Sequence, residues 1–206
     1  MRHTPLLIAA SLSLLASAAV AAPRQDAKLA DFAQRMFATK SFDQKASACF
    51  VRTYDAAHLA RHRKQTVTAM KMLVSAEKLA DDGQLSYSYE LGMNFRNRKG
   101  DHVSSFECGH ARASEARRDD VDVRCHGDGC EGGDGVVIAL APDSKAILVR
   151  IDSVYLRNAS KPKASDDYFA FEGSADNHVF RLDRVDLDKC KSLIQDGGEV
   201  AALQPE

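Results

Sequence analysis

An alternation of apolar and polar side chains from Leu85 to Phe95 constrains the fold more than any other feature of the chain. Six apolar residues occupy every second position of this segment, and the positions between them carry Ser, Glu, Gly or Asn. A period of two is the pattern of a β-strand with one buried face. The segment therefore predicts an amphipathic strand in an antiparallel sheet.

Further β-rich segments follow at short intervals, with polar turns between them. Strands are expected at 67–74, 102–110, 121–125, 136–140, 146–151, 154–156, 168–172 and 178–187. Strands and helices do not alternate along the chain, which argues against a parallel sheet with crossover helices. We therefore predict a mainly β fold, an antiparallel β-sandwich or barrel with one or two short N-terminal helices.

Helical patterns are confined to the ends of this β-rich region. Apolar residues recur at helical spacing between residues 26 and 40, and a second helical stretch is expected at 54–62. A short helix is expected to end the domain at 186–195. We divide the chain into a signal peptide (1–22), an N-terminal helical segment (23–48), an antiparallel β domain (49–195) and a flexible C-terminal tail (196–206).

The first 22 residues have the three parts of a secretory signal peptide. Arg2 and His3 form a basic start, an apolar run covers 6–15, and Ala19-Val20-Ala21 is a small-residue cleavage site. The mature chain is expected to begin at Ala22. Because the first cysteine is Cys49, a lipid-anchored lipoprotein is not expected. The predicted location is therefore the periplasm or the exterior of a bacterial cell.

The charge balance excludes two classes of partner. The chain has 28 Lys and Arg against 29 Asp and Glu, and losing Arg2 with the signal peptide leaves a net charge of about −2. A chain so close to neutral has no overall electric field to hold nucleic acid or an anionic membrane surface. No apolar run after the signal peptide approaches the roughly 20 residues of a membrane helix. The mature chain is expected to have no membrane span.

The five cysteines are an odd number, so at most two disulfides form within the chain and one thiol is left over. The sequence alone leaves the pairing open, but side-chain alternation favours one solution. Cys108 and Cys125 fall on the inward faces of two neighbouring strands and can meet there. Cys49 would then pair with Cys190, leaving Cys130 as a free thiol.

A metal site is the main alternative use of the same region. Cys125, His126 and Cys130 lie close together in the sequence, and His110 is expected on the neighbouring strand. Zinc and copper accept such ligands. In an exported protein, however, cysteines usually form disulfides, which removes the thiolates. We therefore predict no cofactor, with a periplasmic zinc- or copper-binding protein as the alternative.

The motifs of common catalytic centres are missing from the sequence. It has no Gly-x-Ser-x-Gly, no His-Glu-x-x-His, no phosphate-binding glycine loop and no Cys-x-x-Cys pair. An enzyme is therefore not expected, although many active sites have no local signature. The sequence favours a binding protein associated with the cell envelope.

The candidate binding surface is a group of basic residues in two loops. Arg96, Arg98 and Lys99 form one hairpin tip, and Arg117 and Arg118 lie in the next loop, 111–120. If both loops are at one end of the fold, they could bind a protein or a glycan of the envelope. The alternative is a solvated rim that neutralises itself, because acidic residues are interspersed among the arginines.

Three segments carry a resemblance to known proteins: Ser47-Ala48-Cys49-Phe50, the stretch from Tyr54 to Ala60, and Phe106-Glu107-Cys108-Gly109. Together with the β-rich body, they resemble small exported proteins of proteobacteria to which no activity is assigned. A cysteine-bearing strand followed by a glycine-rich turn and a hairpin is also similar to periplasmic lysozyme inhibitors of the small β-barrel kind. That resemblance implies inhibition of a cell-wall-degrading enzyme as a further alternative.

Overall fold

The computed structural model describes residues 22–39, 41–81, 83–110, 122–127, 135–161, 168–174 and 178–194. Within these ranges the chain forms one antiparallel sheet of ten strands and three helical segments. The helical segments are α1 (Ala22–Phe37), α2 (Ala56–Arg61) and the 3-10 helix η1 (Leu187–Leu193). None of the helices in the described part of the chain is long and apolar enough to cross a membrane.

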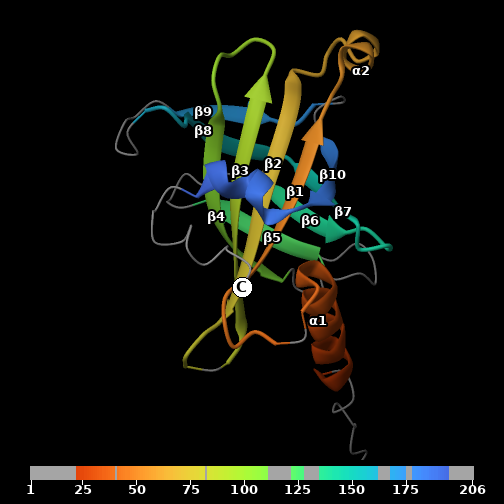
Figure 1. Ribbon diagram of the computed structural model, residues 1–206, viewed down its shortest axis with the longest axis vertical. Helices are drawn as coiled ribbons and strands as arrows, with labels where there is room; N and C mark the ends of the chain where they lie inside the picture. Colours follow the sequence, from red (N-terminus) through yellow and green to blue (C-terminus); the bar gives the residue numbers. More distant parts are fainter. Residues whose placement is uncertain are drawn as a thin grey trace, which may run out of the picture.

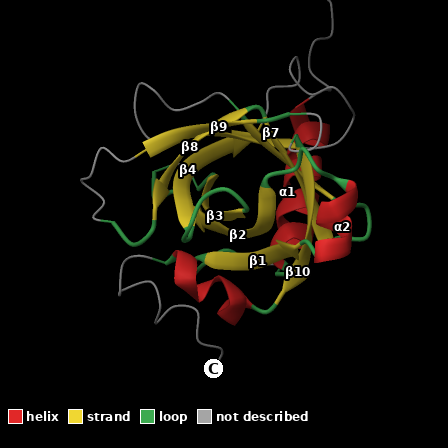
Figure 2. Ribbon diagram, turned by 90° about the horizontal axis from the view of Figure 1, so that it is seen from above, coloured by secondary structure: helices red, strands yellow, loops and turns green. Residues whose placement is uncertain are grey.

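Eight of the ten strands close into a barrel. The sheet runs in the order β3-β2-β1-β10-β7-β6-β5-β4, and β3 also pairs with β4, which joins the two ends (Figures 1 and 2). The hairpin β8–β9 extends the sheet beyond β4. The strands are β1 (Ala46–Thr53), β2 (Val67–Lys78), β3 (Leu85–Phe95), β4 (His102–His110), β5 (Asp122–Gly127), β6 (Val136–Leu140), β7 (Ala146–Ile151), β8 (Ser153–Asn158), β9 (Tyr168–Glu172) and β10 (Val179–Val185).

The predicted fold class is confirmed, and the structure decides for the barrel. One strand was not predicted: β1 begins at Ala46 and so occupies the end of the segment that was expected to be helical. Both faces of β1 are covered. Phe50 points into the barrel, whereas Cys49 and Val51 belong to a cluster on its outer surface. Without a polar face, β1 shows no alternation in its sequence.

The interior of the barrel is filled by alternate side chains of its strands, as in other small barrels. The six apolar residues of β3 all pack into this core, together with several methionines. Burial raises the pKa of Tyr87 to about 12 and raises the pKa of Tyr89 as well. The Tyr89 hydroxyl is buried and has no hydrogen-bond partner among the described residues.

Helix α1 closes the lower end of the barrel in the view of Figure 1. Its buried face includes Phe32 and Phe37, whose rings lie 6.3 and 6.2 Å from the ring of Tyr87. Two arginines fasten the helix. Arg35 donates to the carbonyl of Pro142 at 3.0 Å, in the β6–β7 turn, and Arg184 donates to the carbonyl of Arg35 at 3.1 Å. The helix is therefore held by both apolar and polar contacts.

The fold contains two disulfides among its described residues, and both pairs are as predicted: alternation favours Cys108–Cys125, and Cys49–Cys190 is the pair that then remains. Cys49 of β1 is bonded to Cys190 of η1, with 5.8 Å between their Cα atoms. This bond holds η1 across the outer face of the barrel (Figure 1). Cys108 and Cys125 are bonded directly across β4 and β5, with Cα atoms 4.1 Å apart.

Candidate functional site

The end of the barrel opposite α1 carries the candidate site, which we call the upper rim. It consists of residues 55–66, which contain α2, and residues 96–101, the turn between β3 and β4. Both segments lie at the top in Figure 1. They follow β1 and β3, which run in the same direction, and this direction places their connections at one end of the sheet.

Helix α2 starts at an N-cap aspartate. The Asp55 carboxylate accepts a hydrogen bond of 2.6 Å from the backbone N–H of His58, and this bond lowers the pKa of Asp55. The helix ends at Arg61, after which the N–H of His62 donates to the carbonyl of His58. A side chain such as Asp at this position satisfies a backbone donor that would otherwise have no partner, so the cap defines where the helix begins.

A ladder of stacked planar groups fixes α2 to the end of β1. The rings of Tyr54 and His58 lie 4.6 Å apart, and those of His58 and His62 lie 4.3 Å apart at an angle of 15°. The Arg52 guanidinium lies 5.2 Å from the Tyr54 ring centroid. The histidines spaced four residues apart therefore stack on each other. Burial raises the pKa of Tyr54, and Arg52 partly offsets this effect.

Gln65 anchors the lower side of the ladder. This side chain is 4 % exposed, and its amide nitrogen donates to the carbonyl of Val67 at 2.8 Å. The amide oxygen lies 3.1 Å from Nε2 of His58. Because an amide oxygen only accepts, this arrangement makes Nε2 of His58 the donor. The residues that follow α2 are thereby tied both to the helix and to the first residue of β2.

Arg96 joins the two segments of the upper rim. Its side chain donates to the carbonyl of Leu59 at 2.7 Å and to that of His62 at 3.4 Å, at the exposed end of α2. Its backbone N–H donates to the carbonyl of Thr66 at 2.9 Å. Lysine and arginine side chains near a helix C-terminus commonly satisfy its last carbonyls. The predicted binding residue Arg96 thus holds the rim together.

Arg98, the second predicted binding residue, lies over the ring of Phe169 in β9, 3.8 Å from its centroid. Phe169 packs edge-on against Phe95 and His102, at 5.6 and 5.2 Å between ring centroids. His102 is 5 % exposed, and its Nδ1 atom has no hydrogen-bond partner in the described part of the chain. Burial lowers the pKa of His102, and the positive charge of Arg98 lowers it further.

The upper rim carries a local excess of positive charge in a chain whose net charge is −1. Its two segments hold two carboxylates, and both are engaged: Asp55 caps α2, and Asp101 accepts 2.6 Å from the side chain of Asn94. Five cationic side chains are exposed and form no ion pair with any residue that the structure describes. They are Arg61, Arg63, Lys64, Arg98 and Lys99.

The structure therefore pairs the turn 96–101 with a different segment from the predicted loop 111–120. Arg117 and Arg118 lie outside the described residues, and the strands on either side, β4 and β5, meet at the opposite end of β4 from the turn 96–101. We do not combine these two loops in one surface. Instead, the segment that lies beside the turn of Arg96, Arg98 and Lys99 is residues 55–66, which contain α2. Counting strands could have found it, because every second connection of an antiparallel sheet lies at the same end.

The structure argues against one of the predicted ligands of a zinc or copper ion, Cys125. Cys125 is fully buried and bonded to Cys108, so its sulfur is not available as a thiolate. Cys130 and the side chains of His110 and His126 lie outside the described part of the structure. Among the described side chains, no three His, Cys, Asp or Glu residues gather closely enough to hold a metal ion.

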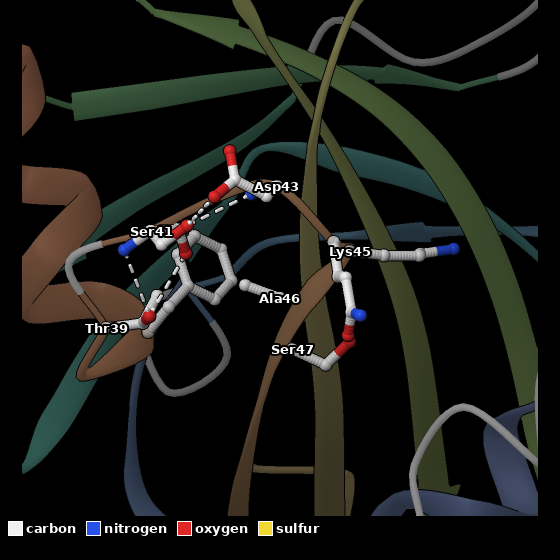
Figure 3. A pocket seen from close by; sticks show the side chains of 8 residues that line it. Thr39, Ser41, Asp43, Lys45, Ala46 and Ser47 are labelled. Carbon is white, nitrogen blue, oxygen red and sulfur yellow. Dashed lines mark hydrogen bonds between the residues drawn. The ribbon is translucent and has the colours of Figure 1, made fainter.

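A shallow polar pocket lies at the other end of the barrel, between α1 and β1 (Figure 3). Its volume is about 430 Å³, and Phe37, Ala46 and Ser47 form part of its wall. Three of its polar residues, Thr39, Ser41 and Asp43, bind one another. The Ser41 hydroxyl donates to Asp43 at 2.6 Å, a bond that, with the nearby Lys78, lowers the pKa of Asp43.

Comparisons with known proteins give no relative from which a function could be transferred. No family model matches the sequence. No curated protein and no solved structure matches it either. The resemblance to small exported proteins stays a prediction, and the function of the chain has to be argued from the geometry of the upper rim.

Proposed function

We propose that this chain is a non-catalytic binding protein that is exported to the periplasm or secreted, associates with the cell envelope and recognises its partner with the upper rim. The two disulfides support export, because such bonds form and persist in oxidising compartments. The signal-peptide pattern of residues 1–22 supports it independently.

One observation carries the choice of surface. Five exposed cations, with no ion pair to any described residue, lie on two segments that Arg96 ties together at one end of a disulfide-linked barrel. Loops held on a rigid scaffold commonly supply recognition. In the described part of the rim, cations outnumber the two carboxylates, which are engaged in hydrogen bonds; the like charges repel one another, which costs free energy unless an anionic partner neutralises them.

The test compares two variants that lose the same charge. In the rim variant, Arg63, Lys64 and Lys99 are changed to Ser; in the control variant, Lys145, Lys189 and Lys191 are changed to Ser. All six side chains are exposed. We expect the rim variant to lose most of its co-sedimentation with isolated cell envelopes, and the control variant to keep it.

Two results would contradict the proposal. Equal retention of both variants on envelopes would mean that the upper rim is not the recognition surface. Finding the native protein in the cytosol with residues 1–21 still attached would contradict export. Sequencing the N-terminus of the protein from a periplasmic extract decides the second point, and Ala22 is the expected first residue.

A further inference from the structure

The exposed cations of the upper rim are spread along two segments. Arg61 ends α2, Arg63 and Lys64 follow it within three residues, and Arg98 and Lys99 come from the turn between β3 and β4. A single carboxylate or phosphate is bound by donors that converge on one point. Five charges spread over two joined segments instead match a ligand that carries several anionic groups in a row, with each group meeting one or two of the cations.

Aromatic side chains adjoin the cations. The hairpin β8–β9 pairs with the start of β4, directly after the turn 96–101, through His102 opposite Asn158. On the outer face of this hairpin, Tyr155 and Tyr168 are 40 % and 50 % exposed. Arg98 already covers the ring of Phe169, the neighbour of Tyr168. Arg98 and Lys99 thus lie at the same corner of the barrel as the exposed tyrosines, and the cations of residues 61–64 extend the basic surface from this turn toward α2.

Exposed tyrosine next to positive charge suits a sugar better than a lipid bilayer. The flat C–H face of a sugar ring packs against an aromatic ring, while the phenol hydroxyl stays in water. A membrane-binding surface instead buries large aliphatic side chains or Trp and Phe among the acyl chains. The large exposed apolar side chains of the β8–β9 hairpin, in its described residues, are the two tyrosines.

We infer that the upper rim, together with Tyr168, binds an acidic glycan, meaning a chain of sugars that carries anionic groups at repeated positions. This inference rests on the proposed function and names the chemical class of its partner. The cations meet the anionic groups, and Tyr168 packs against a sugar ring. The stacked ladder from Arg52 to His62 keeps the basic end of α2 in place for this contact.

The experiment measures binding of the mature, disulfide-bonded chain to heparin by calorimetry at several salt concentrations. Changing Arg63, Lys64 and Lys99 to Ser is expected to weaken binding about 10- to 100-fold and to flatten its salt dependence, because fewer counterions are released. The control variant at Lys145, Lys189 and Lys191 is expected to bind like the native chain. Tyr168→Ser is expected to weaken binding about 3- to 10-fold with an unchanged salt dependence.

Three other probes test the ligand class. Polyglutamate carries repeated charges without sugar rings, neutral dextran carries sugar rings without charges, and phosphatidylglycerol vesicles present charge on a bilayer. We expect each of them to bind at least about 10-fold more weakly than heparin. Equal affinity for polyglutamate and heparin would contradict the sugar contact. Tighter binding to the vesicles would show a membrane-binding surface instead, and equal heparin affinity of the rim and control variants would exclude the rim.

These outcomes can be told apart from a failure of the proposed function. If the rim variant loses envelope association but the native chain does not bind heparin in preference to polyglutamate, the rim is still the recognition surface. Its ligand is then not an acidic glycan. If heparin binds through the rim while envelope association is the same in both variants, the proposed function fails and the glycan-binding site remains.

Discussion

Leu193 packs against the backbone of Gly92 so closely that its Cδ2 atom lies 2.6 Å from the position a Cβ atom would take. Gly92 lies on the outer face of β3, under η1. Changing Gly92 to Ala should therefore force the buried Leu193 side chain to shift, and we expect a loss of about 1 kcal/mol in the free energy of unfolding, the low end of the range for overpacked sites. Urea unfolding measures this loss.

Gly109 offers the matched control. It lies in β4, and, its two chain neighbours aside, no heavy atom of the described residues lies within 4 Å of the position that its Cβ would take. Gly109→Ala should leave stability unchanged or raise it slightly, because alanine restricts the unfolded chain. The double variant Gly92→Ala, Leu193→Ala should lose less stability than the sum of the two single changes, because removing the Leu193 side chain also removes the clash. Purely additive effects would show that the two residues are not in contact.

The two disulfides should contribute unequally to stability. Cys49 and Cys190 are 141 residues apart, whereas Cys108 and Cys125 are 17 apart. Loop-closure entropy then predicts losses of about 5 kcal/mol for the first pair and about 3 kcal/mol for the second when both members are changed to Ala. Urea unfolding of the two double variants checks the order, and the reverse order would show that η1 is held mainly by its apolar contacts.

Removing the Tyr89 hydroxyl should stabilise the protein. This hydroxyl is buried inside the barrel without a hydrogen-bond partner among the described residues. An unsatisfied buried polar group costs about 1 to 3 kcal/mol, so Tyr89→Phe should gain part of that amount. Tyr87→Phe is the control, because the Tyr87 hydroxyl is not among the buried polar groups without a partner. This change should not increase the free energy of unfolding. A clear loss of stability for Tyr89→Phe would indicate a partner such as an internal water.

Arg96 should act through geometry and not only through charge. Arg96→Lys keeps the positive charge but loses the planar group that reaches the carbonyls of Leu59 and His62. We expect amide hydrogen exchange in α2 to become about 10-fold faster, which corresponds to one lost hydrogen bond to a charged group. Lys99→Ser removes a charge from the same turn and should leave exchange in α2 unchanged. Equal exchange rates in α2 for the two variants would contradict a specific role of the Arg96 hydrogen bonds in holding the helix.

Strands with one polar face could be read from the sequence, and strands without one could not. The predicted bounds of β3, β4, β6, β7 and β9 agree with the structure, because each strand is amphipathic or is bounded by turn residues. β1 was missed since η1 covers its outer face, so that Cys49 and Val51 are as apolar as the inward Phe50. Only the tertiary structure brings η1, from the other end of the chain, over that face.

The upper rim shows the same limit. Charge alone identifies Arg96, Arg98 and Lys99 as exposed basic residues, and this prediction could be made from the turn in which they lie. These residues lie beside α2 because Arg96 donates hydrogen bonds to Leu59 and His62, which are more than 30 positions away in the sequence. No local pattern encodes such a pairing. It follows once the order and direction of the strands are known.

Stability should fall on mild acidification because of His102. Burial, reinforced by Arg98, lowers its pKa in the folded protein below the ordinary value of 6.5, so the unfolded chain takes up the proton first as the pH falls. The contribution of His102 is therefore neutral above pH about 7 and becomes destabilising as the pH drops below about 6.5, by up to about 1.4 kcal/mol per pH unit. Carboxylates titrate mainly below this range.

Changing His102 to Gln isolates the effect, because glutamine does not titrate in this range. The variant should be less stable than the native chain near neutral pH, owing to the lost packing against Phe95 and Phe169, but the difference should shrink as the pH falls toward 5. Urea unfolding at a series of pH values measures it. A constant difference would mean that His102 takes up its proton equally in the folded and unfolded chains, and hence that solvent reaches it under the aromatic cluster.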